Sequence, residues 1–165
     1  MYEKLEQFAS EWAQEAKLTE AVMNALTDEA LSREVAPNRR TLGQIAWHLV
    51  ASLHYMASLG LAFEGPPEGD EAPSSAAVIA ERYRQTSESM LQAVMTQWDD
   101  ASLRATAEIM GEQWANGASL RFTVMHQAHH RGQMTVLMRQ AGITLPEVYG
   151  PTYESWIRQG MAPLK

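Results

Sequence analysis

Three histidines stand close together in the segment His126-Gln127-Ala128-His129-His130-Arg131-Gly132-Gln133. If this segment is helical, His126 and His130 lie about 40° apart on the helix surface and one turn from each other. Two imidazoles at this spacing can reach one ion, which is why helical metal sites use it. His129 lies about 100° from His130, so it could replace His130 beside His126 but would not comfortably join both.

A fourth histidine, His48, lies in a second apolar segment. The residues that would share its side of a helix are mostly apolar: Ile45, Ser52, Tyr55, Met56 and Leu59. A helix there would turn His48 toward the interior. His54 lies about 120° around that helix from His48, so the two cannot share a ligand shell. His48, His126 and His130 therefore form a trio that a helical bundle could bring to one point.

Two interpretations of this trio remain open. A histidine in a protein core is more often a hydrogen-bonded structural residue than a metal ligand. However, three neutral imidazoles in one apolar core each have a donor and an acceptor to satisfy, and a divalent cation would satisfy all three acceptors together. Because the chain has no Cys, any metal must take nitrogen or oxygen ligands.

Two well-known kinds of metal site do not fit the residues around the trio. A zinc protease helix has His-Glu-x-x-His with the glutamate as general base, and position 127 is a glutamine. A di-iron bundle uses Glu-x-x-His pairs, whereas the residues three before the trio are Ile45, Thr123 and Gln127. No catalytic or cofactor-binding residue can be assigned from the sequence alone.

Apolar residues three or four positions apart predict the elements that would carry these histidines. Four helices are expected, over about residues 2–26, 42–62, 75–99 and 119–141. Thr41, Ser75 and Ser119 are the expected N-caps, and Gly142 is the expected end of the last long helix. On that helix Arg131 is expected to point away from the histidines.

The segments between these helices carry turn signals. Residues 27–40 predict an irregular connection with one short turn, and residues 64–75 a solvated loop. Residues 104–117 predict a short hairpin or an extended crossing, and residues 151–159 could form a short last helix. We therefore expect an all-α fold, a four-helix bundle with a short irregular or hairpin excursion before the last long helix, in a single domain over residues 1–165.

Charge and hydropathy exclude several classes of partner. The net charge is −7, and the basic residues are scattered apart from the pair Arg39-Arg40, which argues against nucleic-acid binding. Residues 41–63 have no charged side chain, but their polar groups favour a buried helix over a membrane span. The N-terminus lacks the pattern of a signal peptide. We expect a cytoplasmic protein, which the absence of Cys also fits.

Three pieces of the chain resemble the DinB/YfiT-like family, and together the resemblance covers nearly the whole sequence. They are residues 40–49, residues 142–151 and, most specifically, the His-x-x-x-His-Arg-Gly-Gln element over residues 126–133. The resemblance implies a four-helix bundle with up-down-down-up connections, often a dimer, so we expect a homodimer. It also implies one divalent metal ion, nickel or zinc, held by His48, His126 and His130.

Characterised relatives of this family include transferases and isomerases that use bacillithiol, mycothiol or glutathione. Three neutral imidazoles leave an ion with its full charge and an open position, so a bound thiol or water would lose a proton near pH 7. The hypothesis is a metal-dependent thiol S-transferase, or an isomerase or hydrolase of the same family, acting on small electrophiles. The alternatives are a non-catalytic metal- or small-ligand-binding stress-response bundle and a purely structural dimer.

Overall fold

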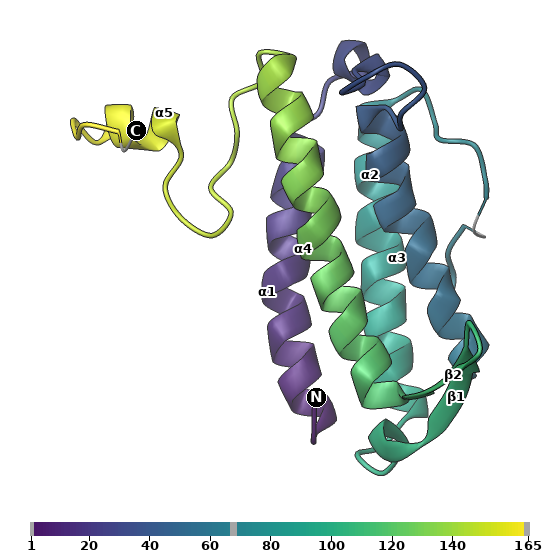
Figure 1. The fold of residues 1–165 in the computed structure, drawn as a ribbon. Helices are drawn as coiled ribbons and strands as arrows, with labels where there is room; N and C mark the ends of the chain where they lie inside the picture. The colour runs from purple at the N-terminus through teal and green to yellow at the C-terminus, as the bar shows by residue number, and fades with distance from the viewer. Residues whose placement is uncertain (1, 67–68, 164–165) are drawn as a thin grey trace.

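The computed structural model describes residues 2–66 and 69–163, and it is mostly helical (Figure 1). Its α-helices are α1 (Leu5–Asn24), α2 (Leu42–Ala51), α3 (Ala76–Gln97), α4 (Asn116–Gln140) and the short α5 (Tyr153–Arg158). Its 3-10 helices are η1 (Asp28–Ser32), η2 (Ser52–Leu59) and η3 (Ser102–Arg104). Two strands, β1 (Thr106–Ile109) and β2 (Glu112–Ala115), form a hairpin before α4.

The four long segments run up, down, down and up, as expected (Figure 1). Two hydrogen bonds mark the ends of α3. The backbone N–H of Ala76, at its start, donates to Asp28 Oδ1 in η1 at 2.6 Å. Just beyond its other end, Asp100 Oδ1 accepts from the N–H of Leu5 at the start of α1 at 2.9 Å. Therefore α3 runs parallel to the preceding α2, and the described parts of the intervening loop, residues 60–66 and 69–75, lie along the outside of the bundle (Figure 1).

The core is divided between the two ends of the bundle, and α2 is its most buried helix. Side chains of Phe8, Trp12 and Met90 pack at one end, and those of Met23 and Tyr83 at the other. Every residue of α2 is buried except Gln44 and His48. One turn separates these two residues, so α2 has a single narrow side that reaches the surface.

The second helical segment departs from the expectation of one α-helix to residue 62. It is α-helical to Ala51 and then continues as η2, which ends at Gly60 with a φ of 88°. In the tighter 3-10 winding, side chains three apart lie above one another. This winding puts Leu53 and Met56 together in the core. Apolar residues at this spacing fit both kinds of helix, so the sequence did not distinguish them.

The segment before α4 is a hairpin, which decides between the two expectations for it. Strands β1 and β2 pair antiparallel, and α4 follows β2 directly, so the expected N-cap at Ser119 is wrong. The helix begins at Asn116, whose N–H donates to Ala105 O at 2.8 Å and whose side chain donates to Ser102 O at 3.0 Å. Thr41 is the expected cap of α2, since its hydroxyl accepts from the N–H of Gln44.

No helix among the described residues is both long and apolar enough to cross a membrane. Within the uncharged stretch over residues 41–63, most of α2 is buried against neighbouring helices. This agrees with the interpretation of that stretch as a buried helix.

Candidate metal centre

The structure brings His48, His126 and His130 together between α2 and α4. His126 Nε2 lies 3.2 Å from His48 Nε2 and 3.1 Å from His130 Nε2. The three residues can each offer one ligand nitrogen within 4.8 Å of the others. His126 and His130 are neighbours because they are one turn apart on α4, whereas His48 joins them because α2 packs beside α4.

Side-chain contacts behind the rings set their orientation. His130 Nδ1 lies 2.7 Å from Gln133 Oε1, and an amide oxygen can only accept, so Nδ1 carries the proton. His130 Nε2 is then left with a free lone pair toward the other two rings. Ser52 Oγ lies 3.5 Å from His126 Nδ1 on the opposite side of that ring. Such partners commonly orient metal-binding histidines.

The donor set fits a divalent cation. Ligand nitrogens about 2.05 Å from a tetrahedral ion are about 3.3 Å from one another, close to the contacts made by His126 Nε2. A neutral imidazole has one N–H, so His126 Nε2 cannot pair well with both neighbouring nitrogens through its own proton. With His130 Nε2 an acceptor, the cluster leaves lone pairs facing each other. A cation would accept them all.

All three rings are held in the uncharged form that binds metals. Burial lowers the pKa of His48 and of His126 to about 4, and burial also lowers the pKa of His130. The positive charge of Arg40 lowers all three pKa values further. None of the three rings therefore carries the second proton of an imidazolium at neutral pH.

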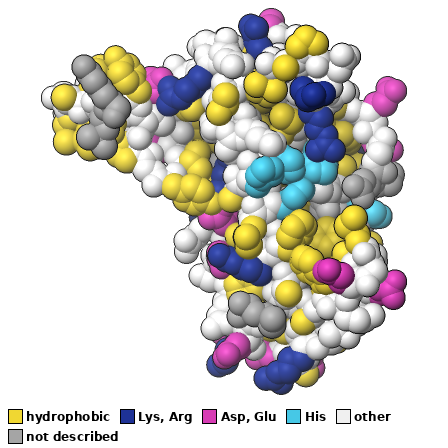
Figure 2. Space-filling model, in the orientation of Figure 1, with side chains coloured by type: hydrophobic (Ala, Val, Ile, Leu, Met, Phe, Trp, Pro, Cys, Tyr) yellow, Lys and Arg dark blue, Asp and Glu magenta, His cyan; other side chains and the backbone are white. Residues whose placement is uncertain are grey.

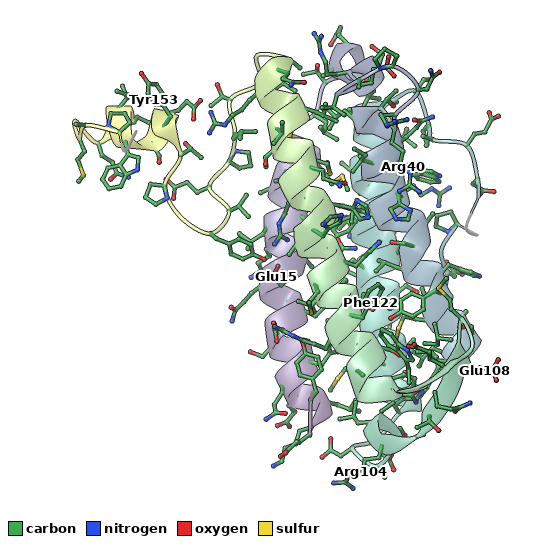
Figure 3. The ribbon with its side chains drawn as sticks, viewed as in Figure 1. Glu15, Arg40, Arg104, Glu108, Phe122 and Tyr153 are labelled. Atoms are coloured by element: carbon green, nitrogen blue, oxygen red, sulfur yellow. The ribbon has the colours of Figure 1, made fainter. Side chains whose placement is uncertain are left out.

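An aromatic group adjoins the cluster on the side toward the hairpin (Figure 3). The ring of Phe122 lies 5.6 Å from that of His126, and Trp114 packs edge-on against Phe122 at 5.7 Å. Tyr55 Oη donates to Ser119 O at 2.7 Å and lies 2.8 Å from Thr123 Oγ1. Burial raises the pKa of Tyr55 to about 12, so this phenol is not a proton acceptor at neutral pH.

Cavities adjoin two of the three histidines. His48 lines one of about 680 Å³, which also contains Asp70 and Glu71. His130 lines another of about 370 Å³, between α4 and the loop before α2. Arg40 lines both. Figure 2 shows histidine side chains at the surface of this face, with basic side chains above them and hydrophobic ones below.

The other two described histidines are outside the cluster. His129 Nε2 lies 3.2 Å from Gln133 Nε2, so His129 does not replace His130 beside His126. His54 faces the ring of Phe63 at 6.2 Å. The structure agrees with the angular argument from the sequence, which separated His54 from His48 and kept His129 from joining both His126 and His130.

Sequence reasoning missed the role of Arg131. It does point away from the histidines, as expected, but it is buried against α1 and not in solvent. Its guanidinium donates to Glu15 Oε2 at 2.5 Å and to Thr19 Oγ1 at 2.9 Å, and it also bonds the phenol of Tyr149. The signal that could have revealed it was the acidic Glu15 on the otherwise apolar side of α1.

The fold and the site together define a helical bundle with a three-histidine cluster between its second and fourth long helical segments. The model of the DinB family matches residues 1–161, and the chain belongs to this family. The resemblance of the sequence to that family is thereby confirmed.

Known proteins agree with this assignment. The chain is 45% identical over 162 residues to the uncharacterized protein YrdA of Bacillus subtilis strain 168, covering 98% of this chain and 97% of YrdA. A solved DinB-like protein from Bacillus cereus ATCC 10987 is 41% identical, with a TM-score of 0.87 over 90% of this chain and 100% of that one. The DinB-like YjoA of Bacillus subtilis, 18% identical, shares the fold with a TM-score of 0.68, covering 86% of this chain and 97% of its own.

Proposed function

We propose that His48, His126 and His130 bind one divalent ion, nickel or zinc, and that the protein is a metal-dependent thiol S-transferase or a related enzyme of its family. The observation that carries this proposal is the convergence of two Nε2 atoms on His126 Nε2 at 3.2 and 3.1 Å. The thiol would be bacillithiol, mycothiol or glutathione, and the second substrate a small electrophile.

The residues around the trio suit such an ion. Gln133 holds His130 with its Nε2 lone pair toward the other rings, and burial keeps His48 and His126 uncharged. When bound, the ion would keep its full charge beside three neutral ligands and would favour the thiolate form of a nearby thiol. Because the chain has no Cys, that thiol would have to be a substrate.

A second candidate function is metal or small-ligand binding without turnover. The state of Tyr55 favours it, because this phenol beside the cluster is already hydrogen-bonded and has a pKa of about 12. It therefore supplies no general base at neutral pH. The same cluster of histidines would then serve a sensor or a sequestering protein.

Metal content separates these candidates from a purely structural role. We expect the wild-type protein to bind about one equivalent of zinc or nickel by elemental analysis, His126→Ala to bind far less and His54→Ala to bind as much as the wild type. His54 is the matched control because it is a half-buried histidine outside the cluster. Equal metal content in His126→Ala and the wild type would overturn the metal site.

Thiol transfer then tests the enzyme. Each of the three thiols is mixed with the metal-loaded protein and monochlorobimane, and the fluorescent adduct is followed. We expect a rate above that of His126→Ala and equal to that of His54→Ala with at least one thiol. A metal-loaded protein with no such rate for any of the thiols would favour binding without turnover.

A further inference from the structure

The smaller cavity beside the trio combines charge, an apolar wall and one of the clustered histidines. Its volume is about 370 Å³, which is within the range of small-molecule sites. It lies between α4 and the loop that precedes α2. Its lining residues are Val35, Arg39, Arg40, Ile45, His130, Gln133, Val136 and Leu137.

The charge of this cavity is positive. Arg39 and Arg40 line it, and none of its lining residues is acidic, whereas the larger cavity beside His48 contains Asp70 and Glu71. Neither arginine forms an ion pair within the described part of the chain. In a protein with a net charge of −7, two exposed guanidiniums without an acidic partner form a local anion-binding surface.

Local structure fixes where Arg40 stands. It immediately precedes Thr41, whose side chain and that of Gln44 form reciprocal hydrogen bonds at the start of α2. The N–H of Leu42 also donates to Arg33 O at 2.7 Å, which closes the loop at its base. The backbone that carries Arg40 is therefore held beside the cavity that its side chain lines, and Figure 3 shows Arg40 on the α2 side of the bundle.

The remaining wall is aliphatic. Ile45 and Leu137 line the cavity and are buried, with 6% and 2% exposure. Val35 and Val136 also line the cavity and are 62% and 54% exposed, so they present apolar surface to its opening. A ligand with a short hydrocarbon body would cover all four and remove apolar surface from water.

We propose that this cavity binds a small aliphatic carboxylate, with the carboxylate on Arg39 and Arg40 and the hydrocarbon body against Val35 and Val136. Because His130 and Gln133 complete the lining, a bound molecule of this class lies next to the histidine cluster. This proposal names the substrate class of the enzyme proposed above. Only the reaction of the carboxylate, and not its binding, rests on that proposed function. Binding of the carboxylate requires no metal.

The test compares 4-methylpentanoate with the neutral 4-methylpentanamide by two-dimensional NMR titration of the metal-free and the zinc-loaded full-length protein. We expect the carboxylate to bind at least about tenfold more tightly than the amide in the metal-free protein, as for hydrogen bonds to charged groups. The shifted backbone signals should lie in residues 33–45 and 130–137.

Charge-removing variants give the matched comparison. Arg40→Gln should weaken the binding of 4-methylpentanoate about tenfold and leave the binding of 4-methylpentanamide unchanged. Arg104→Gln is the control because it removes the same charge from an exposed arginine at the other end of the bundle (Figure 3). Arg40 has no hydrogen bond or ion pair to lose within residues 2–66 and 69–163, so its variant should keep the wild-type melting temperature.

The outcomes are separable from those of the proposed function. Equal binding of carboxylate and amide, or equal loss in Arg40→Gln and Arg104→Gln, would overturn the carboxylate site even if metal binding and thiol transfer are observed. A tenfold preference in a protein that binds neither zinc nor nickel would support the carboxylate site and leave the metal enzyme refuted.

Discussion

His130 Nδ1 lies 2.7 Å from Gln133 Oε1, and this contact determines which nitrogen of His130 faces the other two histidines. The two residues are three apart on α4, so the helix itself brings them together. The other end of the same amide, Gln133 Nε2, lies 3.2 Å from His129 Nε2. With both ends in contact, Gln133 has a defined orientation and keeps the Nε2 lone pair of His130 directed at His126.

Removing this orienting contact should weaken metal binding without destroying the site. We expect Gln133→Ala to lower zinc affinity about 10- to 100-fold, the usual effect of losing a hydrogen-bond partner behind a metal-binding histidine. Competition with a chromophoric chelator measures it. Gln92→Ala, an exposed glutamine on α3, should leave the affinity unchanged. Unaltered affinity in Gln133→Ala would show that the orientation of His130 does not depend on this residue.

The stability of the metal-free protein should fall as the pH is lowered from 7 to 5.5. The pKa of His48 and of His126 is about 4 in the folded protein, below the ordinary value of about 6.5 that the unfolded chain has. Well above pH 6.5 these rings are uncharged in both the folded and the unfolded state, so the contribution of their lowered pKa to the free energy of unfolding is fully present. Below it the unfolded state takes up protons that the folded state does not, so the free energy of unfolding decreases until the folded rings also protonate near pH 4.

Urea unfolding at several pH values between 7 and 5.5 measures this effect, in a window above the range where most carboxyl groups titrate. The variant His126→Asn lacks one of the two histidines whose pKa is lowered to about 4 in the folded protein, so its free energy of unfolding should depend less steeply on pH. Gln92→Ala, which removes no titrating group from an exposed position on α3, serves as control and should keep the wild-type slope. A wild-type protein whose stability does not change over this window would contradict the prediction.

The buried ion pair between Arg131 and Glu15 should matter far more for stability than a surface pair. The two side chains are 1% and 11% exposed, so Glu15→Gln leaves a buried guanidinium without its counter-charge. We expect a loss of about 3–5 kcal/mol in the free energy of unfolding. The control is Glu11→Gln, which breaks the exposed pair with Arg121 and should cost about 1 kcal/mol or less.

The double variant Glu15→Leu with Arg131→Met tests the cause. Replacing both charges by apolar side chains removes the unpaired charge, so its stability should recover most of the loss seen in Glu15→Gln. Urea unfolding monitored by circular dichroism compares the three proteins. A double variant as unstable as the single one would mean that packing around Arg131, and not its charge, is what Glu15→Gln disturbs.

The sequence by itself determined the features that depend on local backbone geometry. The pitch of a helix fixes that His126 and His130 share one side of α4 and that Arg131 does not. Apolar periodicity likewise placed the first, third and fourth long helices to within a few residues, and turn signals located the interruption before α4 without deciding between a hairpin and an extended crossing. These inferences need no knowledge of what packs against each element.

Only the tertiary structure determined which residues of different elements contact one another. His48 and His126 are 78 positions apart in sequence, and their 3.2 Å contact depends on how α2 packs against α4. The same holds for the pairing of Arg131 with Glu15 and for the cavity that the loop carrying Arg40 forms with α4. Helical spacing states which way a side chain points, but the choice of its partner depends on the packing of the whole chain, because many arrangements bury the same apolar surface.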